Sequence, residues 1–131
     1  MLESKSTVLR GVLLNASFAF AVVGASGAAL AQAVPHSTVA SPDVYKVLKE
    51  DEQYRVISVT WKPGQRDAWH SHPSSGIYYL TPCSLRIHMP DGKSRDFNQW
   101  AGAAFVQKPV ASHSLENIGK TDCNLIMFEP R

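Results

Sequence analysis

Short β-rich segments, each closed by a turn signal, make up the chain from residue 44 to its end. Valine, isoleucine, threonine and aromatic residues, which favour strands, dominate these segments. Turns containing Gly or Pro recur at roughly ten-residue intervals, as they do in sandwiches and barrels. No apolar repeat of about 3.6 residues, the sign of an amphipathic helix, is sustained there. The pattern predicts one all-β domain with strands over residues 45–49, 54–61, 77–80, 84–89, 94–99, 103–107, 112–117 and 124–129.

A His-x-His pair, His70 and His72, follows the turn at Gly64. Alternate side chains of a strand point to the same face, so both imidazoles are expected on one surface. Two histidines so placed can bind one metal ion when further ligands come from elsewhere in the fold. Alone the pair is weak evidence, because paired histidines also occur on exposed strands.

A third histidine, His113, stands on a later predicted strand, four residues before Asn117. A barrel or jelly roll brings strands that are distant in the chain around one interior. His70, His72 and His113 are therefore predicted to meet as three nitrogen ligands of one divalent metal ion. Imidazole is compatible with zinc, iron, copper, nickel and manganese, so the identity of the metal stays open.

These residues resemble the two sequence motifs of the cupin superfamily, over roughly residues 54–129. The first motif has a glycine, five residues, His-x-His and, three or four residues later, a glutamate; the second has a glycine and ends in histidine, three residues and asparagine. The resemblance implies a cupin-type jelly-roll β-barrel with the histidines inside. The positions that match are Gly64, His70, His72, Gly102, His113 and Asn117.

Two positions depart from the first motif: Gly76 stands where the family's metal-binding glutamate would fall, and Cys83 where its closing glycine would fall. Asp67 and Glu116 have the opposite strand parity to the histidines and are not expected to replace the glutamate. Three neutral histidines leave a divalent ion with its full charge and open positions, which favours an anionic or chelating ligand. The alternative is a cupin that has lost its metal.

Two functions therefore stay open, and the sequence does not decide whether the protein is an enzyme. One is a metal-binding cupin of oxygenase or isomerase type, acting on a small anionic or chelating substrate. The other is a binding protein without catalysis, for a carboxylate or a sugar, with or without metal. Tyr78 shares strand parity with Gly76 and is a candidate substrate contact; the alternative is a core tyrosine. A homodimer is a further expectation, because small cupins often pair through their barrels.

The first 33 residues have the layout of a secretory signal peptide. Lys5 and Arg10 precede an uncharged, largely apolar stretch over residues 11–33, which ends in two overlapping small-x-small cleavage patterns. Cleavage is expected before Val34, so the protein is predicted to be exported, either periplasmic or secreted, without stable membrane insertion. The alternative, a retained anchor of roughly 20 apolar residues, is opposed by the polar residues and glycines within the stretch.

Residues 34–43 contain two prolines and no periodicity, and they are predicted to form a flexible arm in which His36 faces solvent. Residues 44–131 are predicted to be the barrel domain. Both cysteines, Cys83 and Cys123, lie in this domain. An oxidising compartment permits a disulfide between them, and the alternative is two separate buried thiols.

The charge of the predicted mature chain argues against nucleic acid as a partner. The leader holds two of the 13 basic residues and one of the 11 acidic residues, which leaves 11 basic and 10 acidic residues. A protein that binds nucleic acid through its phosphates is expected to carry a strongly basic face. A small molecule is the predicted ligand.

Overall fold

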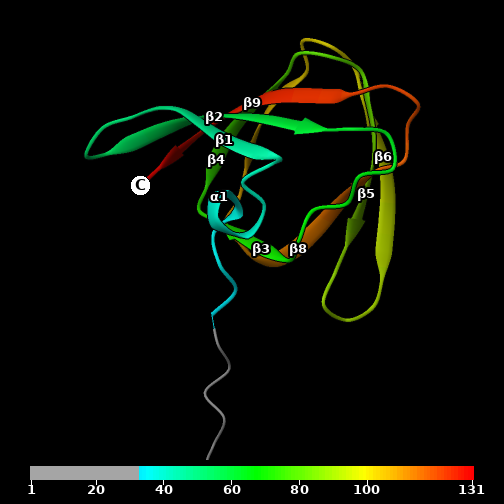
Figure 1. Cartoon of the computed structure of the whole chain (residues 1–131), viewed down its shortest axis with the longest axis horizontal. Helices are drawn as coiled ribbons and strands as arrows, with labels where there is room; N and C mark the ends of the chain where they lie inside the picture. The colour runs from blue at the N-terminus through cyan, green and yellow to red at the C-terminus, as the bar shows by residue number, and fades with distance from the viewer. Residues whose placement is uncertain (1–32) are drawn as a thin grey trace, which may run out of the picture. The chain divides into compact units, whose positions relative to one another are not determined.

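Nine strands in two sheets dominate the computed structural model, which describes residues 33–131 (Figure 1). The predicted all-β fold class is confirmed. The signal-peptide prediction concerns residues 1–33, almost all of which lie outside the described residues. The strands are β1 (Tyr45–Glu50), β2 (Tyr54–Trp61), β3 (His70–His72), β4 (Ser75–Tyr79), β5 (Cys83–His88), β6 (Ser94–Gln99), β7 (Ala104–Gln107), β8 (Val110–Asn117) and β9 (Cys123–Pro130).

The strand order is β1-β2-β9-β4-β7 in one sheet and β3-β8-β5-β6 in the other. Neighbouring strands are mostly distant in the chain. β2, for example, pairs along its whole length with β9, from Tyr54 opposite Pro130 to Trp61 opposite Cys123. This jelly-roll arrangement curls the two sheets around one interior, as the sequence predicted.

The interior is filled by every second residue of the strands. Ile57, Val59 and Leu85 have no exposed surface, and β9 buries its alternate residues from Cys123 onward. Strand side chains alternate between faces, so this period of two fixes which residues meet in the core. The same alternation on β9 also turns Glu129 inward, where its side chain is fully buried.

A disulfide between Cys83 and Cys123 joins the start of β5 to the start of β9. The two strands belong to different sheets, so the bond links the four-stranded sheet to the five-stranded one. Closing a loop of 40 positions stabilises the folded state by about 4 kcal/mol in the chain-entropy model. The bonded arrangement, rather than two separate thiols, is the one that the structure contains.

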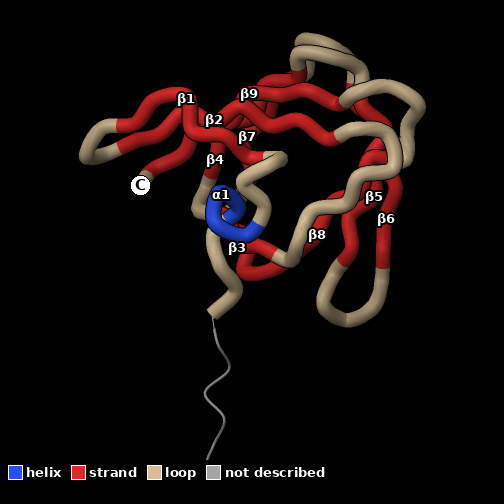
Figure 2. The backbone as a smooth tube through the Cα atoms, viewed as in Figure 1, coloured by secondary structure: helices blue, strands red, loops and turns tan. Residues whose placement is uncertain are grey.

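The segment before β1 packs against the barrel through the short helix α1 (Ser37–Ala40), which contacts β1 and β3 (Figure 2). The Ser71 amide donates a hydrogen bond to the Pro35 carbonyl at 2.9 Å, and His36 forms an isolated bridge with Ser71. The expectation that His36 faces solvent is wrong, because Nε2 of its ring lies 2.5 Å from the buried carboxylate of Glu129. The flexibility of residues 34–43 stays a prediction.

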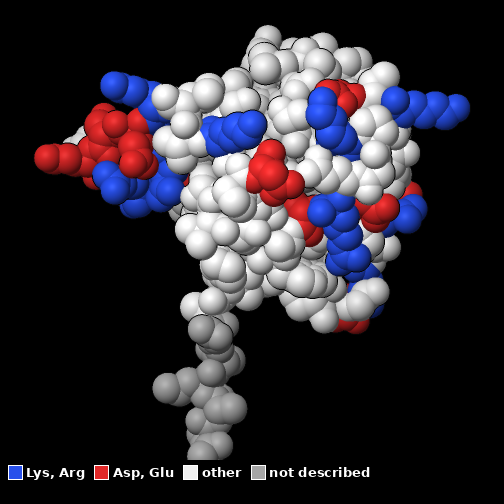
Figure 3. Space-filling model, viewed as in Figure 1, with Lys and Arg blue, Asp and Glu red and all other residues white. Residues whose placement is uncertain are grey.

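On the face shown in Figure 3, basic and acidic side chains of residues 33–131 are interspersed without a large area of one sign. Many of them are paired, such as Arg86 with Asp96 and Lys62 with Asp122. Within the described part of the chain, no helix has the length and apolar character needed to cross a bilayer.

Candidate metal centre

His70, His72 and His113 converge inside the barrel, as predicted. β3 pairs with β8, and this register sets His70 opposite His113. The centroid of the His70 ring lies 4.7 Å from that of His72 and 4.6 Å from that of His113, and all three side chains are buried. One nitrogen from each ring lies within 4.8 Å of the others. Ligand nitrogens around a metal such as zinc are about 3.4 Å apart, so small rotations would bring the three rings to one ion.

The protonation of these rings suits metal binding. Burial, followed by the nearby His70 and His72, lowers the pKa of His113 to about 3. Burial also lowers the pKa of His70, although the neighbouring Asp67 opposes this effect. Only neutral imidazole offers a lone pair to a metal. Both rings are therefore held in the form that a metal ion requires.

An unpartnered nitrogen marks the site as incomplete. Nε2 of His113 is buried and has no hydrogen-bond partner among residues 33–131. A buried polar atom without a partner costs about 1–3 kcal/mol, so such atoms are rare in folded proteins. A metal ion bound between the three histidines would remove this cost, and the residues present therefore fit a metal.

His70 is oriented by the backbone and by Tyr45. Its Nδ1 lies 2.8 Å from the Ala68 carbonyl, which can only accept, so Nδ1 carries the proton and Nε2 the lone pair. The Tyr45 hydroxyl lies 3.1 Å from Nε2 but donates its proton to Asp67 at 2.8 Å. The lone pair on Nε2 is thus left available for a cation.

Asp67 is a buried carboxylate that supports the site without belonging to it. It accepts hydrogen bonds from the Tyr45 hydroxyl at 2.8 Å, the Trp61 indole at 2.9 Å and the Leu115 amide at 2.7 Å. Burial and the charge of Asp67 raise the pKa of Tyr45 well above its usual value. Glu116, the other carboxylate weighed from the sequence, pairs with His88 at 2.9 Å. Oδ1 of Asp67 lies 3.5 Å from Nδ1 of His70, so the expectation that Asp67 faces away from the histidines is wrong. Neither Asp67 nor Glu116 belongs to the group of ligand atoms that the three histidines form.

Sequence analysis missed Glu129, a second buried carboxylate that lies beside the histidines. Its oxygens lie 3.6 Å from Nδ1 of His72 and 2.5 Å from Nε2 of His36, and Ser75 donates a hydrogen bond to it at 3.3 Å. Burial opposes ionisation of Glu129, but its contacts with His36 and His72 prevail and lower its pKa to about 2. The signal was present in the sequence, because Glu129 has the inward parity of Met127 on β9.

The outward position of Gly76 corrects the interpretation of the missing glutamate. Ile77 and Tyr79 line the interior cavity, whereas Gly76 and Tyr78 lie on the outer face of β4. A glutamate at position 76 would point away from the histidines. Tyr78, the candidate substrate contact, is 49% exposed on that outer face, and Tyr79 takes the inward position instead. An error of one residue in register reverses every side chain of a strand.

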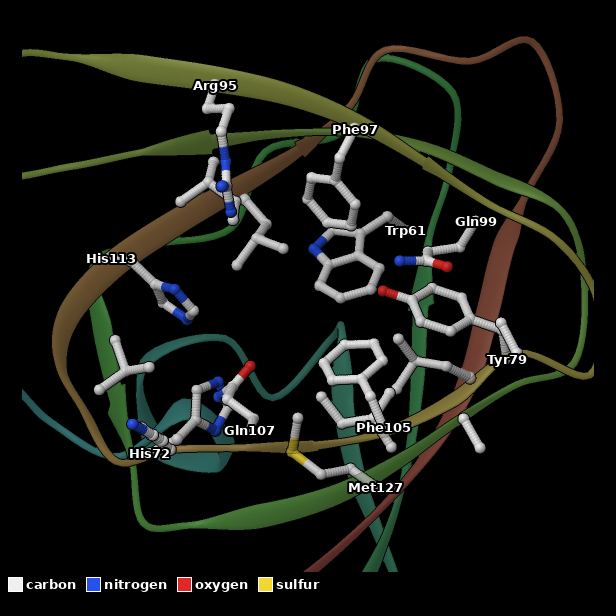
Figure 4. Close-up of a pocket in the computed structure, with 18 of the residues that line it drawn as sticks. Trp61, His72, Tyr79, Arg95, Phe97, Gln99, Phe105, Gln107, His113 and Met127 are labelled. Atoms are coloured by element: carbon white, nitrogen blue, oxygen red, sulfur yellow. The ribbon is translucent and has the colours of Figure 1, made fainter.

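A cavity of about 750 Å³ adjoins the histidines, with His72 and His113 in its wall (Figure 4). This volume is within the range of small-molecule sites. Aromatic side chains form most of the opposite end, and the polar side chains that Figure 4 labels around the cavity, besides the histidines, are Arg95, Gln99 and Gln107. The aromatic and thioether side chains of the wall include Trp61, Tyr79, Phe97, Phe105 and Met127.

Comparison with protein-family models gives no match, and comparison with curated proteins gives none either. Solved structures do match. A cupin domain from Bordetella pertussis Tohama I is 19% identical with a TM-score of 0.61, and the match covers 75% of this chain and 96% of that one. A double-stranded β-helix protein from Klebsiella pneumoniae is 21% identical with a TM-score of 0.53, over 66% and 75% of the two chains.

A cupin superfamily protein from Desulfitobacterium hafniense DCB-2 matches with a TM-score of 0.50 at 7% identity, over 66% of this chain and 75% of that one. At these identities the comparisons establish the fold and not the activity. In this chain the barrel gathers His70, His72 and His113 in its interior. The chain therefore has a cupin fold, with three histidines that form a candidate metal site.

Proposed function

We propose that this protein is an exported cupin that binds one divalent metal ion through His70, His72 and His113. The observation that carries the proposal is the buried Nε2 of His113, which has no partner among residues 33–131 and faces two further histidines. The leader sequence and the paired cysteines, which suit an oxidising compartment, support export.

The ligand is a small anionic or chelating molecule that occupies the adjoining cavity. Three neutral imidazoles do not neutralise a divalent ion, so a ligand with an anionic oxygen supplies both charge and a donor atom. A bound divalent ion would act as a Lewis acid toward that donor. His72 and His113 in the cavity wall hold the ion next to the ligand, while the apolar wall excludes water.

Binding without catalysis is the second candidate function, and the composition of the cavity favours it over acid–base catalysis. The carboxylate in the cavity wall is Asp96, and both of its oxygens are occupied by Arg86 at 2.6 and 2.9 Å. Among residues 33–131, the cavity wall therefore contains no unpaired carboxylate that could act as a general base. An oxygenase, whose chemistry is supplied by the metal, or a binding protein fits this wall better than an acid–base isomerase.

Elemental analysis of the purified protein tests the metal proposal. The wild type is compared with His70→Ala/His72→Ala and with His88→Ala, which removes a histidine that pairs with Glu116 outside the site. We expect stoichiometric metal in the wild type and in His88→Ala, and its loss in the double variant. The same trace metal content in all three folded proteins would contradict the proposal. Oxygen consumption with a panel of small acids and diketones then separates an oxygenase from a binding protein.

A further inference from the structure

Arg95 projects into the cavity from β6. On this strand Arg95 and Phe97 pair with Ile87 and Leu85 of β5, and Leu85 is fully buried, so the four residues share the inward face. Ile87 pairs on its other side with Leu115 of β8, which places Arg95 on the same interior face as His113. Figure 4 shows the guanidinium directed into the cavity at the end that holds His113.

The side chains that line the cavity carry more positive than negative charge, which favours an anionic ligand. Arg95 and Lys108 both line it, and no carboxylate of residues 33–131 forms an ion pair with either. Asp96 is engaged by Arg86, whose hydrogen bonds lower the pKa of that carboxyl and keep it ionised. Arg95 and Lys108, which are exposed residues where they line the cavity, therefore bring two cations without a counter-charge to its wall.

The rest of the cavity wall is complementary to an anion whose remaining part is apolar. Trp61, Phe97 and Phe105 line the part of the cavity away from His113, as Figure 4 shows. Aromatic walls favour flat apolar groups, which stack or pack edge to face against them. A sugar would need several hydrogen-bonding groups there, and the polar groups that Figure 4 labels at that end are the Gln99 amide and the Tyr79 hydroxyl, while Gln107 lies beside His72.

We propose that the cavity binds an aryl or arylalkyl carboxylate, with its carboxylate held by Arg95 and its ring between the aromatic side chains. The planar guanidinium matches a carboxylate with two parallel hydrogen bonds, which an ammonium group cannot do. The inference rests on the proposed function, because it names the chemical class of the anionic ligand that the proposed function places in the cavity. The pairing with Arg95 itself does not require the metal.

Calorimetric titration with three probes tests the inference: 3-phenylpropanoate, its neutral amide, and acetate. The protein is compared with Arg95→Gln and with Lys93→Gln, which removes one positive charge from the same β5–β6 hairpin at a side chain that is 78% exposed. We expect phenylpropanoate to bind best. Its affinity should fall roughly tenfold to a hundredfold in Arg95→Gln, the range for a lost charged hydrogen-bonded pair, and stay unchanged in Lys93→Gln.

The same titrations with chelator, together with the metal content of each variant, separate this inference from the proposed function. If the wild type as purified holds no metal and binding still depends on Arg95, the metal proposal fails and the carboxylate site stands. Equal affinity for the acid and the amide, equal affinity in wild type and Arg95→Gln, or no binding of any probe to folded protein would each overturn the carboxylate site. Thermal unfolding of each variant verifies that it is folded.

Discussion

The carboxylate of Glu129 lies 3.6 Å from Nδ1 of His72, so a buried acid on β9 backs a histidine of the candidate metal centre. The two residues come from different sheets and are far apart in the chain. A carboxylate behind a metal-binding histidine orients the ring and raises its basicity. Glu129 therefore provides, from behind a ligand, negative charge that the cupin glutamate would provide directly.

Removing this charge should weaken metal binding. We expect Glu129→Gln to lower metal affinity roughly tenfold to a hundredfold, the usual effect of losing such a supporting carboxylate. Competition with a metal-sensitive dye measures the affinity. Glu116→Gln, which breaks the pair with His88 outside the site, is the matched control. Equal affinities of the two variants would show that Glu129 does not act on His72.

Introducing a glutamate at position 76 should not restore a metal ligand. Gly76 lies on the outer face of β4, and an added Cβ there would lie 3.9 Å from the Phe128 carbonyl, an ordinary contact. We expect Gly76→Glu to leave metal affinity equal to that of Gly76→Ala, measured with the same dye. Tighter binding by the glutamate variant would place position 76 inside the barrel and contradict the observed strand register.

The metal-free protein should lose stability in mild acid. The pKa of His113 falls from 6.5 unfolded to about 3 folded, so below pH 6.5 the unfolded chain binds a proton that the folded chain does not. Stability is therefore complete above that pH and decreases as the pH falls toward 3, by about 1.4 kcal/mol per pH unit for each such group. The pKa of Glu129, lowered from 4.5 to about 2, adds a loss in the same direction below pH 4.5.

Urea unfolding in the presence of chelator, followed at successive pH values from neutral to mildly acidic, measures this dependence. His113→Gln provides the comparison, because it retains a polar side chain that does not titrate. The variant should show a shallower pH dependence than the wild type. Identical slopes would mean that His113 is not held neutral in the folded state.

Replacing Asp67 should destabilise the fold more than replacing an exposed acid. Asp67→Asn exchanges one acceptor for a donor beside the Trp61 indole and the Leu115 amide, so at least one buried donor loses its partner. We expect a loss of about 1–3 kcal/mol in the free energy of unfolding. Asp96→Asn, at a side chain that is 50% exposed, should cost much less. Equilibrium urea unfolding compares the two, and equal losses would contradict the support role of Asp67.

Reduction of the disulfide should lower the unfolding temperature. The Cys83–Cys123 bond closes a loop of 40 positions, and its loss should cost about 2–4 kcal/mol. Thermal unfolding with and without reductant measures the change. The Cys83→Ser/Cys123→Ser variant should unfold at the temperature of the reduced protein and should not respond to reductant. A reductant effect on this variant would assign the change to another cause.

Local alternation was enough to predict most strands and the three histidines. The β-branched run over 54–61 and the alternation before Pro90 each specify a strand, and the buried residues of these strands include Ile57, Val59 and Leu85. The His-x-His pair and His113 could be combined because a barrel has one interior. These inferences depend on side-chain period, which a sequence displays directly.

The errors concern features that the alternation of side chains along a single strand does not reveal. Tyr78 was expected to face inward because it shares strand parity with Gly76, where the cupin glutamate would fall, but β4 turns Ser75, Ile77 and Tyr79 inward instead. His36 was assigned to solvent because its segment has two prolines and no periodicity, and nothing local indicates its contact with the distant Glu129. Arg95 was not weighed, since its inward direction depends on the pairing of β6 with β5.

The two ends of β9 are connected to the four-stranded sheet by different kinds of interaction, one covalent and one noncovalent. Cys123 is covalently bonded to the four-stranded sheet, whereas six residues later Glu129 meets His72 of that sheet through contacts that water can replace. Separation of the two sheets is therefore expected at the histidine end rather than at the disulfide. A ligand that binds His72 would stabilise the contact between His72 and Glu129. Ligand binding and opening of the cavity are then thermodynamically linked.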